Sequence, residues 1–129
     1  MTHRQNISSN TVWEEKVGYS RAVRIGDTIE VAGTTALDGD RIIAPGEPYK
    51  QMCFIFEKIE QALNQAGASL NDVIRTRMYI IDLAHTDEIG RAHLKYFKDI
   101  KPASTMIQIN GLVNPDLVVE VEVTAVVSS

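Results

Sequence analysis

The sequence predicts an α+β fold in which two helices pack on one face of a sheet of about five or six strands. Two segments carry apolar residues at helical spacing, several others alternate apolar with polar residues, and strands lie before, between and after the helices. The 129 residues are 44% hydrophobic and 23% charged, which is typical of a single globular domain. We therefore interpret residues 1–129 as one domain.

The first sixteen residues are mostly polar and lack periodicity, so residues 1–16 are predicted to form an irregular N-terminal arm. This segment lacks the apolar run of a secretory signal, and no stretch approaches the roughly 18 apolar residues of a membrane span. The single cysteine, Cys53, excludes a disulfide within the chain and fits a reducing compartment. We therefore expect a cytoplasmic protein with no membrane partner.

A β-hairpin is predicted after the arm, because residues 22–25 and 28–33 alternate in polarity on either side of a turn signal. Residues 41–43 form a short segment between two further turn signals. The first helix is predicted over residues 52–66, and Gly67 fits its C-terminal end. Its apolar residues at helical spacing are Met52, Ile55, Phe56, Ile59, Ala62, Leu63 and Ala66.

The second half of the chain predicts a strand, a helix and two more strands. Residues 75–83 are rich in strand-forming residues. Thr86 or the next residue caps the second helix, and Pro102 follows its end. Residues 103–110 and 117–126 are predicted strands. The apolar face of this helix comprises Ile89, Ala92, His93, Tyr96, Phe97 and Ile100.

Two helices can cover only one face of the predicted sheet. In the last strand, Val119, Val121 and Val123 point to one face, whereas Glu120 and Glu122 point to the other. An apolar face left uncovered needs a partner chain, so this pattern favours an oligomer without giving its number.

In this order of elements, the chain resembles the Rid family, also called the YjgF or L-PSP endoribonuclease-like family. The resemblance runs from about Val17 to Val126 and is carried by four segments, "VGYSRAVRIGDTIEVAGT", "QALNQAGASLNDVIRTRMYIIDL", "KPASTM" and "LVVEVEVTAV". It implies a chorismate-mutase-like fold, a homotrimer, and clefts for a small-molecule ligand at the subunit interfaces. It also implies hydrolysis of reactive imines or enamines to keto compounds and ammonia, without a metal or organic cofactor.

The resemblance further implies which residues line the site. Tyr19 matches a tyrosine of the family's N-terminal segment, and Gly33 matches a glycine whose backbone approaches the ligand. Glu120 matches a glutamate that positions or activates water. A carboxylate with a pKa near neutrality can take a proton from water and return it to the leaving ammonia. On its pattern alone, Glu120 is an exposed strand residue that alternates with valines.

Three positions depart from the family pattern. Ser104 stands where the imine-hydrolysing members have an arginine that holds the substrate carboxylate. A serine hydroxyl cannot supply the charge or the two parallel hydrogen bonds of a guanidinium. Ala32 and Gly90 replace a frequent serine and a frequent asparagine. We therefore expect a substrate that differs from the usual 2-imino acids, unless another cation replaces the arginine.

Four side chains are candidates for that cation. Arg91 and His93 lie near the start of the second helix, and Arg21 and Arg77 lie on strands. The alternatives are a solvated surface role for each arginine and a packed, hydrogen-bonded role for the histidine. Thr105 is either a hydrogen-bond donor to a ligand or an ordinary strand threonine.

Three functions follow from these observations. The first is a cofactor-free deaminase, and the second is non-catalytic binding of a small carboxylate or keto acid in the same cleft. The third, a ribonuclease or translation inhibitor, is disfavoured because the net charge of −4 is unlike that of nucleic-acid binders. The three histidines do not show metal-ligand spacing, so no metal is expected.

Overall fold

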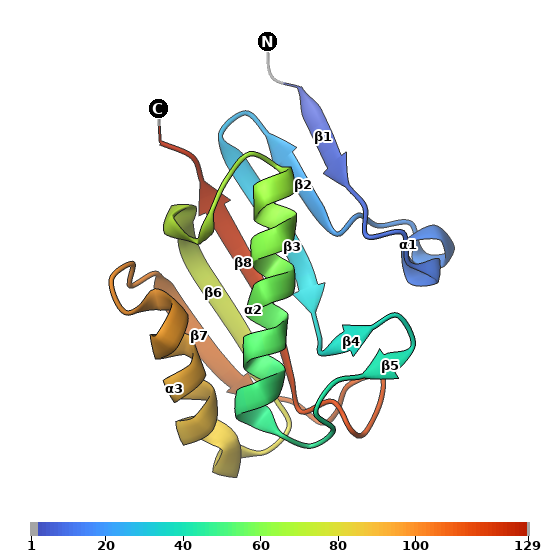
Figure 1. Ribbon diagram of the computed structural model, residues 1–129, viewed down its shortest axis with the longest axis vertical. Coiled ribbons are helices and arrows are strands. Elements are labelled where there is room, and N and C mark those ends of the chain that lie inside the picture. The colour runs from blue at the N-terminus through green and yellow to red at the C-terminus, as the bar shows by residue number, and fades with distance from the viewer. Residues whose placement is uncertain (1–2, 129) are drawn as a thin grey trace.

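The computed structural model describes residues 3–128 as two layers, a six-stranded sheet and two long helices that lie across one of its faces (Figure 1). The strand order is β1-β2-β3-β8-β6-β7, and β4 and β5 pair separately. The strands are β1 (Arg4–Ile7), β2 (Ala22–Ile25), β3 (Thr28–Thr34), β4 (Leu37–Asp38), β5 (Arg41–Ile42), β6 (Val73–Ile80), β7 (Ala103–Gln108) and β8 (Val119–Val126). The helices are α1 (Val12–Val17), α2 (Pro48–Gln65) and α3 (Thr86–Phe97), with short 3-10 turns at Leu70–Asp72 and Leu83–His85.

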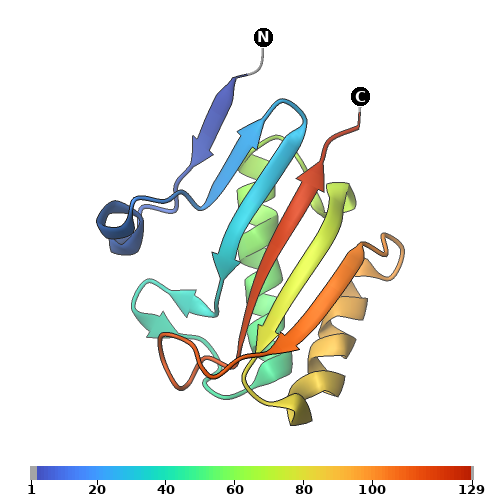
Figure 2. The same ribbon diagram turned by 180° about the vertical axis from the view of Figure 1, so that it is seen from behind.

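The sheet is mixed, because β6 and β7 are parallel and the other neighbouring strands are antiparallel. A parallel pair needs a crossover connection, and α3 supplies it between β6 and β7. Figure 2 shows the face of the sheet that no long helix covers. The predicted α+β fold, with both long helices on one face of the sheet, is confirmed.

The prediction of an irregular arm over residues 1–16 is wrong for its described part, and residues 1–2 lie outside the described residues. The strand β1 pairs with β2, and the helix α1 follows. The Thr11 side chain caps α1 by accepting a hydrogen bond from the Glu14 amide, and Gly18 ends the helix with a φ of 83°. The buried Glu14 carboxylate also accepts hydrogen bonds from Ser8, Ser9 and Thr11. Polar contacts of this kind leave no apolar periodicity in the sequence.

Several element boundaries differ from the predicted ones by two to four residues. The helix α2 begins at Pro48, four residues early, because proline fits the first turn, where an amide proton has no partner within the helix. The helix α3 ends at Phe97, and Lys101 then takes a φ of 52° and donates its amide to the Phe97 carbonyl. The strands β7 and β8 are each two residues shorter than predicted.

The expectation of an apolar uncovered face is wrong. Val119, Val121 and Val123 of β8 are buried, so they lie on the face of the sheet against which α2 packs. The uncovered face of β8 therefore carries Glu120 and Glu122, and the sheet's alternation adds polar side chains from β6 to the same face. The pattern of β8 therefore gives no support for an oligomer, which the resemblance to the Rid family still implies.

One buried polar side chain, Gln51, fixes the start of β8. Gln51 lies in α2 and is fully buried. Its Nε2 donates to the carbonyls of Ala44 at 3.1 Å and Asp116 at 2.9 Å, with a longer contact of 3.3 Å to that of Ile43. Its Oε1 accepts from the Val118 amide at 3.0 Å. These bonds join α2, the loop before it and the chain that enters β8, two residues before Glu120.

Replacing Gln51 by alanine is expected to lower the free energy of unfolding by about 2–4 kcal/mol. The change leaves buried backbone groups without partners and opens a cavity beneath the start of β8. Urea unfolding measures the effect. The control is Gln61→Ala on the exposed side of the same helix, expected to change stability by less than about 0.5 kcal/mol. Equal effects at the two positions would contradict this account of Gln51.

Candidate functional site

The carboxylate of Glu120 lies against the backbone of Gly33. Glu120 is half-buried on β8, and Gly33 lies in β3, within a register shift between Val31 and Thr34. A Cβ atom placed on Gly33 would be 2.5 Å from the Glu120 Oε2, closer than non-bonded atoms approach. The glycine therefore makes room for the carboxylate, which any other residue would displace.

Arg21 and Tyr19 complete this group of side chains. The Arg21 Nη2 donates to the Gly33 carbonyl at 2.6 Å, and its guanidinium lies 6.0 Å from the centre of the Tyr19 ring. The Arg21 Nε is buried and has no hydrogen-bond partner within the described chain. We call Tyr19, Arg21, Gly33 and Glu120 the Glu120 cluster.

Burial and charge oppose each other at Glu120. Burial raises the pKa of the Glu120 carboxyl, the charge of Arg21 opposes that rise, and the charge of Glu122 adds to it. Burial also lowers the pKa of Arg21, which the Tyr19, Glu14 and Glu120 groups offset. The result is a carboxyl group that holds its proton to a higher pH than an ordinary glutamate does, beside a half-buried cation.

A second half-buried cation, Lys58 of α2, was not among the predicted site residues. Burial lowers the pKa of Lys58, and repulsion by Arg21 adds to the effect. Its Nζ donates to the Leu37 carbonyl at 2.8 Å. Lys58 falls on the polar side of the helical pattern, so the sequence carried no signal that would have singled it out.

Ser104 lies elsewhere, on the side of the sheet that the helices cover. The Thr76 Oγ1 donates to the Ser104 Oγ at 2.8 Å and lies 2.9 Å from the His93 Nε2. We call His93, Thr76 and Ser104 the Ser104 cluster. Glu120 lies on the opposite face, with β6 between its strand and that of Ser104. One chain therefore does not bring Ser104 and Glu120 together.

The sequence of residues 12–127 matches the family described as Endoribonuclease L-PSP. The chain belongs to this family. The crystal structure of Rv2704 from Mycobacterium tuberculosis, described as a member of the YjgF/YER057c/UK114 family, superposes with a TM-score of 0.89 at 41% identity, covering 97% of this chain and 100% of that one. The resemblance to the Rid family is therefore confirmed.

Two curated relatives of the L-PSP family member extend the comparison. An uncharacterised protein of Streptomyces coelicolor, SCO2049, is 36% identical over 121 residues, which cover 94% of this chain and 90% of that protein. The 3-aminoacrylate deaminase RutC of Acinetobacter baylyi is 30% identical over 104 residues, which cover 80% of this chain and 82% of that protein.

The remaining predicted residues lie outside the Glu120 cluster of this L-PSP family member. The Arg91 guanidinium lies 5.2 Å from the centre of the Tyr49 ring, at the start of α2. Thr105 accepts a hydrogen bond from Arg75. Arg77 of β6 lies directly opposite Glu122 of β8 in the strand register. Among the four predicted cations, Arg21 is the one whose charge acts on the pKa of Glu120.

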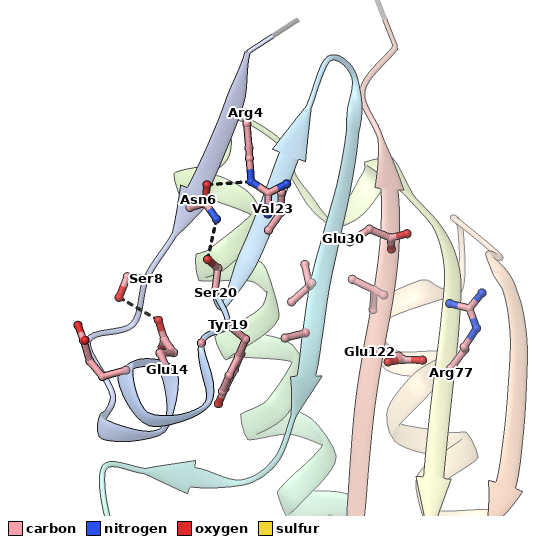
Figure 3. A pocket seen from close by; sticks show the side chains of 15 residues that line it. Arg4, Asn6, Ser8, Glu14, Tyr19, Ser20, Val23, Glu30, Arg77 and Glu122 are labelled. Atoms are coloured by element: carbon pink, nitrogen blue, oxygen red, sulfur yellow. Dashed lines mark hydrogen bonds between the residues drawn. The ribbon is translucent and has the colours of Figure 1, made fainter.

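A hollow of about 800 Å³ lies between α1 and the uncovered face of the sheet (Figure 3). Tyr19 and Glu14 contribute to it from one side, and Arg77 and Glu122 from the strands (Figure 3). Its lining carries both signs of charge, so the hollow as a whole does not select an anion or a cation.

Among residues 3–128, no three His, Cys, Asp or Glu side chains gather in a way that suits a metal ion. No helix in this described part of the chain has the length and apolar character needed to cross a membrane.

Gly33→Ala is expected to move the Glu120 carboxylate toward solvent and bring its pKa back toward the ordinary value. The clash is with the end of a flexible side chain, so the free energy of unfolding should change by less than about 1 kcal/mol. A carbon-13 NMR titration of the carboxyl group measures the shift. The control is Gly90→Ala, where a Cβ meets open space on α3. An unchanged pKa of Glu120 in Gly33→Ala would contradict the proposed contact.

Glu120→Gln is expected to be increasingly stable relative to the wild type as pH rises. A raised folded-state pKa means that the protonated carboxyl stabilises the fold below the ordinary value of 4.5, and this stabilisation is lost as pH rises through the folded-state value. Glutamine stays neutral throughout. Urea unfolding at several pH values from about 4 to 8 measures the difference, with Glu15→Gln, at an exposed residue of α1, as the control. A difference that does not vary with pH would rule out a raised pKa.

Proposed function

We propose that this protein is a Rid-type deaminase, which hydrolyses a reactive imine or enamine to a keto compound and ammonia without a cofactor. The observation that carries the proposal is the half-buried Glu120 carboxyl with a raised pKa, seated against Gly33 and beside Arg21. The family membership and a relative that is named a 3-aminoacrylate deaminase support the same reaction class.

In this proposal, Glu120 accepts a proton from oxygen and donates it to nitrogen. Its carboxylate takes a proton from water as the water oxygen bonds to the imine carbon, and it passes this proton to the nitrogen, which gives the carbinolamine. Glu120 then takes the proton of the carbinolamine hydroxyl as the carbon–nitrogen bond breaks and the oxygen becomes the carbonyl, and this second proton leaves with ammonia. An enamine first gains a proton at carbon and loses one from nitrogen to give the imine. A carboxyl pKa raised toward neutrality favours both the uptake and the release of the proton.

Arg21 supplies the positive charge of the proposed site. A guanidinium stays charged under all ordinary conditions, so Arg21 stabilises the ionised form of Glu120 and attracts an anionic group of the substrate. Its one bond to Gly33 leaves further N–H groups for a ligand oxygen. Tyr19 lies over the guanidinium and offers an aromatic wall to the substrate.

The proposed site is completed by a second copy of the chain. Ser104 and Glu120 lie on opposite faces of one sheet, and Ser104 is exposed on the edge strand β7. A homotrimer in which β7 of one copy approaches the uncovered face of the next allows a single small ligand to contact both residues.

The alternative proposal is ligand binding without turnover. It is favoured by the replacement of three family residues in one chain, at Ala32, Gly90 and Ser104. Under this alternative, a small keto acid stabilises the fold but releases no ammonia. Ribonuclease activity has less support, since the net charge is −4 and the hollow over the open face carries both signs of charge.

Glu120→Gln is expected to lower ammonia release from 2-iminopropionate or 3-aminoacrylate, each generated in situ, by about 10²–10⁴-fold, because glutamine cannot carry the proton. Circular dichroism and thermal unfolding show whether the fold is retained. The control is Glu15→Gln, at an exposed residue of α1. If wild type and Ser104→Arg are both inactive with both substrates while pyruvate stabilises the fold, the binding alternative replaces the deaminase proposal.

A further inference from the structure

A line of hydrogen-bonding side chains runs from α3 along the helix-covered face of the sheet to its β7 edge. His93 lies among aromatic rings, with its centroid 6.0 Å from that of Phe56 and 4.8 Å from that of Phe97. Thr76 is fully buried, with an exposed fraction of 0%. Ser104 is exposed to solvent. A buried hydroxyl and a half-buried imidazole in this apolar layer are costly unless they are hydrogen-bonded, and here each one is.

The direction of these bonds follows from counting protons. A threonine hydroxyl has one proton, and that of Thr76 is donated to the Ser104 Oγ. With that proton used, the 2.9 Å contact between Thr76 and His93 is a donation from the His93 Nε2–H. Burial lowers the pKa of His93, which favours the neutral imidazole near pH 7.

This direction leaves the hydroxyl proton of Ser104 unused within the line. Ser104 accepts from Thr76 and has its own proton free to donate, and it lies on an exposed edge strand. Successive donors polarise one another, so the last hydroxyl is a better donor than an isolated serine.

We propose that His93, Thr76 and Ser104 form a donor chain that presents the Ser104 hydroxyl to an uncharged oxygen of a bound ligand, such as an amide or ester carbonyl. The inference rests on the proposed function for the presence of a ligand at this edge of the sheet. Ser104 contacts the ligand, whereas Thr76 and His93 are positioning residues that act through it.

An uncharged acceptor fits because the donor chain carries no formal charge. A carboxylate that is moved out of water needs a positive partner, and a neutral hydroxyl does not provide one. The guanidinium of Arg75, on the neighbouring strand, is bonded to Thr105, whose side chain points away from that of Ser104 in the alternation of β7. A carbonyl oxygen needs only the hydrogen bond.

The test compares the binding of pyruvamide with that of pyruvate. Both compounds have three carbons and a keto group, but pyruvamide carries an amide where pyruvate carries a carboxylate. NMR titration of the wild-type protein is expected to give about tenfold tighter binding of pyruvamide, which corresponds to about one neutral hydrogen bond. Ser104→Ala and Thr76→Val are each expected to lose that advantage. Thr76→Ser keeps the hydroxyl and is expected to retain it, and Ser104→Arg is expected to prefer pyruvate.

A second readout separates this role from simple packing. Nitrogen-15 spectra are expected to show the Nε2–H tautomer of His93, and pyruvamide is expected to shift its signals in the wild type but not in Thr76→Val. Ser104→Ala changes an exposed residue, so it tests the inference even if Thr76→Val does not fold.

Three results would overturn the inference. They are a wild type that binds neither compound or prefers pyruvate, a Ser104→Ala variant that binds pyruvamide as the wild type does, and a His93 with its proton on Nδ1. Ammonia release by the wild type and Glu120→Gln is a separate measurement. A protein without deaminase activity can therefore still pass this test, and an active one can fail it.

Discussion

The position of β8 between β3 and β6 is the constraint on which the rest of the structure depends. The strand is hydrogen-bonded on both sides, and its alternate residues Val119, Val121 and Val123 are buried beneath the helices. Because side chains alternate with a period of two, this burial directs Glu120 and Glu122 to the uncovered face. A shift of one residue would bury both carboxylates in the apolar layer, at a cost far above the net stability of a domain this size.

Local irregularity then determines what Glu120 can do. In an ideal ladder, Glu120 would be one more exposed carboxylate on an open face. The register shift in β3 brings the backbone of Gly33 under it, and the chain that enters β2 brings the half-buried guanidinium of Arg21 near it. Removal from water is the largest influence on its pKa, and it outweighs the opposite influence of Arg21. The carboxyl therefore holds its proton more strongly although a cation lies close by.

The sequence predicted the parts of the molecule that depend on periodicity. Helical spacing predicted α2 and α3, and alternation predicted β8 and the face that carries Glu120. Polar contacts stabilise α1 and β1, so the sequence pattern did not predict the secondary structure of residues 4–17. Arg21 was one of four candidate cations, because sequence spacing does not give distances between strands that meet only in the folded sheet. For the same reason, the sequence placed Ser104 and Glu120 in one site without revealing that β6 separates them.

The separation of the two clusters also limits how one ligand can be bound. The Glu120 cluster carries charge and opens on the uncovered face, whereas the Ser104 cluster is neutral and ends at the β7 edge. A ligand of a few carbon atoms cannot contact both through a sheet. In the proposed homotrimer, contact with a second copy would place a charged group and a neutral donor on either side of one ligand. A substrate suited to both would combine a carbonyl oxygen for Ser104 with an imine carbon within reach of Glu120.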